Sequence, residues 1–196
     1  MASISLKYKS KQGNLTAPGD VDPGAMIPIA TTTVGSGGAS SVSFTNIPNT
    51  YSHLQVRFLA RQTSASGTQA YYLEVNGDTG NSYTNHFLYG NGSTVTAEGY
   101  VTGNFNGFGP MYITGTADSN IYSVGIIDIL DYANTNKNKT IRGLHGHDAN
   151  GSGNIYLTST GWLSTSAITS LKFFRASSTI AQNTQIALYG IKTAGA

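Results

Sequence analysis

The stretch Tyr-Ser-His-Leu-Gln-Val-Arg-Phe-Leu-Ala-Arg-Gln, residues 51–62, decides the fold class. One parity carries the apolar side chains Leu54, Val56, Phe58 and Ala60, and the other carries His53, Gln55, Arg57 and Arg61, interrupted only by Leu59. Successive side chains on a β-strand point to opposite faces, so this alternation predicts a strand with one buried and one solvent face. Such a strand needs partner strands and a second layer. Two of the four arginines lie on the solvent face, which predicts that this face meets a partner.

The rest of the chain supplies the partner strands. Short segments rich in β-branched and aromatic residues predict strands at 27–34, 41–45, 70–75, 82–89, 111–114, 121–132, 139–147, 154–163, 168–175 and 184–192. Residues 93–118 are interrupted by glycines and give only one of these. Roughly ten to twelve short strands without sustained helical periodicity are typical of an antiparallel β-sandwich or jelly roll. The order of the strands does not follow from the pattern.

The most apolar segment is Ile121–Tyr132. It carries apolar side chains on both parities, Val124, Ile126 and Leu130 on one and Ile127 and Ile129 on the other. Two hypotheses explain this pattern: the strand is covered on both faces, or one face packs at an interface.

Composition narrows the classes of function. With 196 residues, the chain is long enough for one domain plus an arm. Charged residues make up only 10%, against a typical ~25%. The absence of cysteine excludes disulfides and thiolate chemistry. A net charge of +2 does not favour a nucleic-acid partner, and no apolar run approaches the ~18 residues needed to span a membrane.

The first 26 residues differ from the remainder. They begin with a short basic alternating segment and continue through 12–24 with many turn residues and few apolar ones. We expect 1–26 to be an extended N-terminal anchoring arm and 27–196 to be an all-β, jelly-roll-like sandwich domain. The expected contact residues of the arm are Lys7, Lys9, Lys11, Leu15, Pro18, Asp20, Asp22, Pro23 and Met26. A terminus without a partner is the alternative.

Several blocks of the sequence carry a resemblance. They include the arm from Lys9 to Ile29, Tyr-Ser-His-Leu-Gln at 51–55, Glu-Val-Asn-Gly-Asp-Thr-Gly-Asn-Ser-Tyr at 74–83, Asp-Tyr-Ala-Asn at 131–134 and Ala-Leu-Tyr-Gly-Ile at 187–191. Together they span nearly the whole chain and are similar to small virion proteins of tailed phages of marine bacteria, cyanophages included. The resemblance implies a jelly-roll-like subunit on the phage exterior, in a tail fibre, an appendage or a capsid decoration.

The resemblance also implies partners and a location. It predicts a non-enzymatic structural protein of the virion, assembled in the host cytoplasm and anchored through its arm to capsid, collar or tail proteins. We expect a homo-oligomer, and a trimer in particular. No catalytic residue and no cofactor come with the resemblance.

The alternative function is a receptor- or glycan-binding module of a tail fibre. Tyrosines are suited to stacking on sugars, and the candidates are Tyr71, Tyr72, Tyr83, Tyr89 and Tyr100. Tyrosine is also common in ordinary strands and at protein interfaces, which is the competing explanation.

The sharpest local motif is His-Gly-His-Asp at 145–148. Spaced by two on a strand, His145 and His147 share a face, and Asp148 could orient one imidazole toward a metal ion. In a trimer, three such pairs would converge on the axis as an octahedral site. The alternative is a pair of solvated or hydrogen-bonded histidines beside the turn at 148–153.

Other polar motifs favour turns over chemistry. Asp20 and Asp22, and likewise Asn76–Asp78, supply too few oxygen ligands for a calcium loop. Glu74 and Glu98 are the only glutamates, and nothing in the sequence places two carboxylates together as a glycosidase requires. The sequence has neither a nucleophile elbow nor a phosphate-binding loop. We therefore predict that the chain is not an enzyme, with a polysaccharide hydrolase as the remaining enzymatic alternative.

Overall fold

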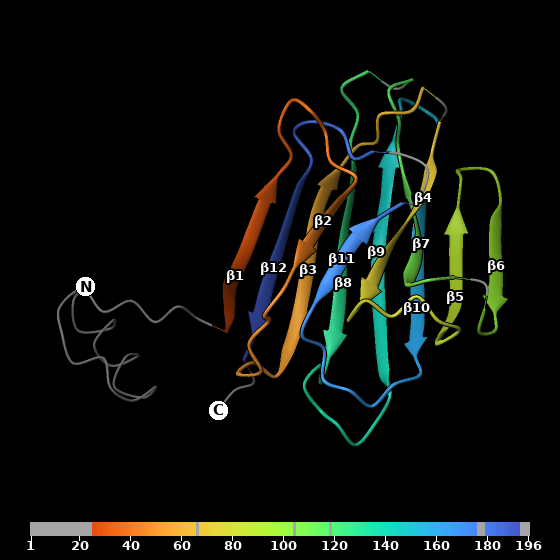
Figure 1. The fold of residues 1–196 in the computed structure, drawn as a ribbon. Coiled ribbons are helices and arrows are strands. Elements are labelled where there is room, and N and C mark those ends of the chain that lie inside the picture. The colour runs from red at the N-terminus through yellow and green to blue at the C-terminus, as the bar shows by residue number, and fades with distance from the viewer. Residues whose placement is uncertain (1–24, 66, 104, 118, 176–178, 193–196) are drawn as a thin grey trace, which may run out of the picture.

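The computed structural model describes residues 25–65, 67–103, 105–117, 119–175 and 179–192 (Figure 1). These residues form an all-β structure without helices. The strands are β1 (Met26–Thr33), β2 (Ser41–Phe44), β3 (His53–Ala60), β4 (Gln69–Val75), β5 (Tyr83–Gly90), β6 (Val95–Tyr100), β7 (Phe108–Ile113), β8 (Ser123–Leu130), β9 (Lys139–Asp148), β10 (Gly153–Trp162), β11 (Leu171–Phe174) and β12 (Gln185–Ile191).

Two antiparallel sheets pack as a sandwich (Figure 1), which confirms the predicted fold class. The larger sheet has the order β1-β12-β3-β8-β9-β10-β5-β6, and the smaller has β2-β11-β4-β7. The pairs β3–β8, β4–β7 and β5–β6 are nested like the two halves of one long folded hairpin, as in a jelly roll. The pairs β1–β12 and β2–β11 enclose them, and β9 and β10 widen the larger sheet to eight strands.

The central strand β3 follows its sequence pattern. Leu54, Val56, Phe58 and Ala60 all face the smaller sheet and are buried. The ring of Phe58 lies 5.6 Å from that of Phe173 on β11, which stacks on Tyr71 at 5.4 Å between centroids. This aromatic contact joins the two sheets.

The contact depends on a glycine in the neighbouring strand. Gly125 on β8 lies directly opposite Phe58. A Cβ atom at Gly125 would lie only 2.3 Å from Cζ of Phe58 and 2.8 Å from Cβ of His145. The missing side chain therefore provides the space that the Phe58 ring fills.

The tight turn predicted at Asn76–Asp78 is present. Asn76 and Gly77 have φ angles of 52° and 70°, and the Asp78 N–H donates to the Val75 carbonyl at 2.9 Å. The turn does not form a hairpin, because β4 before it and β5 after it belong to different sheets. It instead carries the chain across the sandwich.

The structure differs from the sequence predictions at β6 and at Met26. Strand β6 lies in the glycine-interrupted segment and was not predicted, since it pairs only with β5 at the sheet edge and carries little apolar pattern. Met26 was assigned to the arm, yet it begins β1 and pairs with Ile191. The other predicted arm contacts, Lys7, Lys9, Lys11, Leu15, Pro18, Asp20, Asp22 and Pro23, lie outside the described residues.

The fit of Phe58 over Gly125 yields a stability prediction. Replacement Gly125→Ala should lower the free energy of unfolding by about 1–3 kcal/mol, because the added methyl group overpacks the contact between the sheets. Gly37→Ala is the matched control, since a Cβ atom there meets nothing within 4 Å. Urea unfolding of both variants measures the difference, and equal stability of the two would contradict this account of the core.

Candidate functional site

The outer face of the larger sheet carries two neighbouring rows of aliphatic side chains that the smaller sheet does not cover. In the first row, Ile126, Leu144, Leu157 and Leu88 lie directly opposite one another on β8, β9, β10 and β5. The second row contains Leu59, Val124, Ile155 and Val95. Their exposed fractions run from 41% for Ile126 to 74% for Val95. We call these eight side chains the aliphatic face.

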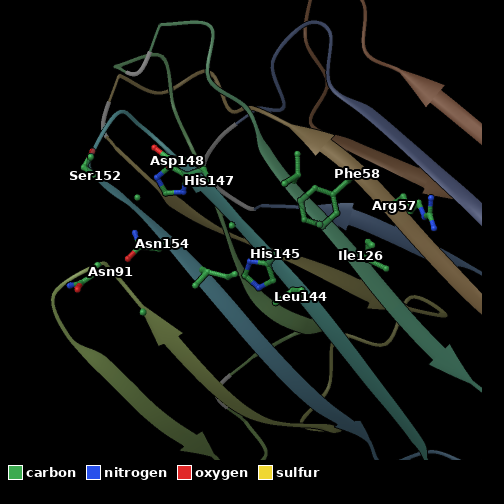
Figure 2. Close-up of a pocket in the computed structure, with 18 residues that line it drawn as sticks. Arg57, Phe58, Asn91, Ile126, Leu144, His145, His147, Asp148, Ser152 and Asn154 are labelled. Atoms are coloured by element: carbon green, nitrogen blue, oxygen red, sulfur yellow. The ribbon is translucent and has the colours of Figure 1, made fainter.

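Glycines interrupt the second row and hollow it out. Gly146 lies between Val124 and Ile155, and Gly90 lies between Ile155 and Val95. The result is a groove of about 820 Å³ (Figure 2). Its polar rim comes from the β5–β6 loop and the β9–β10 hairpin, with Asn91, Asp148 and Ser152 among the lining residues.

A row of hydrogen-bonded polar side chains borders the first row of the aliphatic face, on the side away from the second row. Gln55 donates to Oδ1 of Asp128 at 2.9 Å, and Arg57 donates from Nε to the Gln55 side-chain oxygen at 2.8 Å. Arg142 pairs with Oδ2 of Asp128 at 3.4 Å. The aliphatic face is therefore bounded by charged groups along β9, with Arg142 at one end and Asp148 at the other.

The two arginines of residues 51–62 have different positions. Arg57 is exposed on the outer face beside the groove. Arg61 follows the end of β3 and donates to the carbonyls of Gly115 and Thr116 at 3.2 and 3.3 Å. Only Arg57 thus lies beside the aliphatic face, directly opposite Ile126.

His145 points between the sheets rather than outward. Its side chain is 3% exposed, its Nε2 lies 3.3 Å from Oγ1 of Thr158, and its ring stacks on Tyr156 at 5.0 Å between centroids. Burial lowers the pKa of His145 to about 4, so the imidazole is neutral at pH 7. His147 lies on the same side of β9 and is half-buried.

This placement bears on the predicted metal site. Among the described residues, no cluster of three or more His, Cys, Asp or Glu side chains could hold a metal ion. A site on a trimer axis needs imidazoles that reach a neighbouring copy, and the buried ring of His145 does not. The contact with Thr158 fits the alternative of a hydrogen-bonded histidine for His145, and the metal site stays a prediction.

The candidate tyrosines separate into two groups. Tyr71 and Tyr83 are 0% exposed, so they belong to the core and cannot stack on a sugar. Tyr89 and Tyr100 are half-buried on β5 and β6, where Tyr89 stacks on Tyr156 with ring centroids 5.1 Å apart.

Tyr100 lies at the centre of a second set of contacts at this edge of the sheet. It stacks on Phe87 with centroids 5.8 Å apart and donates its hydroxyl to Glu98. Tyr72 lies on β4 and packs against Phe105 and Phe174. The half-buried tyrosines therefore form part of an extended aromatic cluster.

The remaining polar candidates are separated from one another. Glu74 pairs with Lys172 across the smaller sheet at 3.2 Å, whereas Glu98 accepts from Tyr100 at the edge of the larger sheet. Asp78 accepts the indole N–H of Trp162 at 2.8 Å. Trp162 is 2% exposed, as expected of a core residue.

Comparison of the chain with protein-family models, curated proteins and solved structures yields no match. In the part of the chain that the structure describes, no helical segment has the length and hydropathy needed to cross a bilayer.

The sequence contained part of the signal for the aliphatic face. Apolar side chains on both parities of 121–132 indicated either double coverage or an interface, and the structure leaves Val124, Ile126 and Leu130 exposed within the chain. Ile155 and Leu157 carry the same signal on β10, beside the buried Tyr156, and it was missed. The role of Gly146 and Gly90 in forming the groove follows only from the strand register, which the sequence pattern does not reveal.

The buried imidazole of His145 yields a prediction on pH. An unfolded histidine has a pKa near 6.5, whereas that of folded His145 is about 4. Between these values the unfolded chain binds more protons, so the free energy of unfolding falls as the pH drops from 7 to 4, by up to about 3 kcal/mol. Replacement His145→Gln should flatten this dependence, and His86→Gln, at an exposed position, should not. Unfolding curves at pH 7, 5.5 and 4 measure both, and an unchanged slope in His145→Gln would contradict the prediction.

Proposed function

We propose that the chain is a non-enzymatic structural protein of a phage virion, displayed on the particle exterior as a capsid decoration or as a tail-fibre or appendage subunit. Its partners are other virion proteins of the capsid, collar or tail and further copies of itself, and it is assembled in the host cytoplasm. The resemblance of its sequence blocks to small virion proteins supports the assignment to a phage virion. The β-sandwich fold is compatible with this proposal.

The aliphatic face is the observation that carries an assembly role. Large exposed apolar patches on soluble proteins mark surfaces that another molecule covers. The eight aliphatic side chains occupy adjacent positions on six neighbouring strands, β3, β8, β9, β10, β5 and β6. Burial of this surface against protein is favourable in proportion to its area. In a subunit of a larger assembly, such a face would be buried against a neighbouring protein.

The position of β1 supports anchoring through the N-terminal segment. Among the described strands, β1 is at the edge of the larger sheet and has β12 as its one neighbour there. The carbonyl of Ala25, just before β1, accepts the Lys192 N–H at 2.9 Å. Ala25 therefore lies at the margin of the body, where a neighbouring protein can approach it.

Removal of the arm tests the anchoring role. Deletion of residues 1–24, which keeps Met26 and the whole of β1, should leave a soluble, folded body that no longer enters particles. The measurement is mass spectrometry of purified particles assembled with tagged full-length or truncated chain, and circular dichroism confirms folding of the truncated form. Equal incorporation of the two chains would remove the arm from the mechanism.

Glycan binding is the second candidate function. The observation that favours it is the cluster of half-buried tyrosines on β5, β6 and β7, where Tyr89, Tyr100 and Tyr112 lie near Glu98. Tyr112 and Tyr89 each stack on Tyr156, with ring centroids 5.0 and 5.1 Å away. Aromatic rings beside a carboxylate are suited to sugar recognition.

A glycan array with the full chain tests this candidate. Specific binding of a host envelope glycan is expected, and Tyr100→Ala should weaken it at least about tenfold, the equivalent of about 1.4 kcal/mol. Tyr122→Ala serves as control, because Tyr122 lies outside the cluster and donates to the Gln182 carbonyl. An array without a bound glycan, or equal loss in both variants, would count against this function.

A further inference from the structure

We propose that two copies of the chain pack face to face through the aliphatic face. They are related by a two-fold axis that runs across the strands and passes over β9 between Leu144 and Gly146. This contact refines the proposed self-association, but it concerns the isolated chain. It can therefore fail or succeed independently of incorporation into particles.

The order of outward-facing residues on β9 supports this arrangement. In chain order they are Thr140, Arg142, Leu144, Gly146 and Asp148, and the last four border the aliphatic face. When β9 of a second copy lies over this strand in the opposite direction, Arg142 of each copy faces Asp148 of the other. Leu144 of each copy then faces Gly146 of the other. The strand is thus complementary to itself in charge and in shape.

Strands β5, β8 and β10 follow the same rule, whereas β3, at the margin of the face, places Arg57 of one copy opposite Leu59 of the second. On β5, Leu88 of one copy faces Gly90 of the second, so that a second leucine meets a glycine hollow. On β8 and β10, Ile126 faces Val124 and Leu157 faces Ile155, aliphatic against aliphatic. The groove of about 820 Å³ lies over Gly146 and beside Gly90, and it would receive the two leucines of the second copy.

The size of the face suits a dimer. Eight aliphatic side chains at 41–74% exposure leave open on the order of 700 Å² of surface, close to the ~800 Å² that each partner buries in a standard interface. Two sheets stack at about 10 Å and within about 30° of parallel, which brings the central strands β8, β9 and β10 into contact.

Charges disfavour the other face-to-face arrangement. A two-fold axis parallel to β9 would place Arg142 over Arg142 and Asp148 over Asp148, and like charges in contact are strongly unfavourable. Face-to-face packing of one surface with itself requires two-fold symmetry. We therefore infer a dimer through this face in place of the expected trimer.

Sedimentation velocity of the full-length chain tests the contact first. The native chain should sediment as a concentration-dependent dimer at micromolar concentration, and Leu144→Arg as a monomer. Leu163→Arg is the matched control, because Leu163 is 50% exposed and Leu144 52%, yet Leu163 lies beyond the end of β10. A monomeric native chain, or a dimer that withstands Leu144→Arg, overturns the proposal.

A charge exchange tests the geometry. Arg142→Glu and Asp148→Lys should each raise the dimer dissociation constant at least about tenfold, because each places like charges together. The double variant restores opposite charges and should return the dissociation constant to near the native value. Circular dichroism establishes that every variant is folded. Failure of the double variant to recover, with all variants folded, overturns the two-fold arrangement.

Discussion

Phe58 packs over Gly125 and against Phe173, and this contact attaches the smaller sheet to one face of the larger one. A strand has two faces, and the second sheet of a sandwich can cover only one of them. The eight strands of the larger sheet therefore keep a second face that the described part of the chain leaves open. The side chains that alternate with the core residues along each strand determine whether that open face is polar or apolar.

Strand β9 shows the consequence of this alternation. Its inward residues include His145, which the core holds neutral by lowering its pKa, and its outward residues include the exposed Leu144. Burial of the imidazole places the His145 ring away from the face that a neighbouring copy could reach, and the metal site stays a prediction. Exposure of the leucine creates a surface that is apolar without being part of the core. The outward face of β9 is therefore suited to contact with another protein.

The sequence predicts the strands better than their arrangement. Period-two alternation identified β3 and most other strands within a few residues, because each strand has a buried face. It missed β6, an edge strand with little apolar pattern. The nested pairing, and therefore the alignment of Leu144 with Ile126 and Leu157, depends on contacts between distant segments that no local pattern records. Tyr71 and Tyr83 were candidates for sugar contacts, but both are buried, in line with the competing explanation that tyrosine is common in strands whether they face solvent or core.

The central claim is that the open face of the larger sheet is covered by a second copy in one orientation. Because the chain has no cysteine, single cysteines at Arg142 and Asp148 can report on that orientation through a short bismaleimide cross-linker. A mixture of Arg142→Cys and Asp148→Cys chains should give a cross-linked dimer, whereas each variant alone should not. Cross-linking of either variant with itself, or none in the mixture at a concentration where the chain is dimeric, would contradict the account.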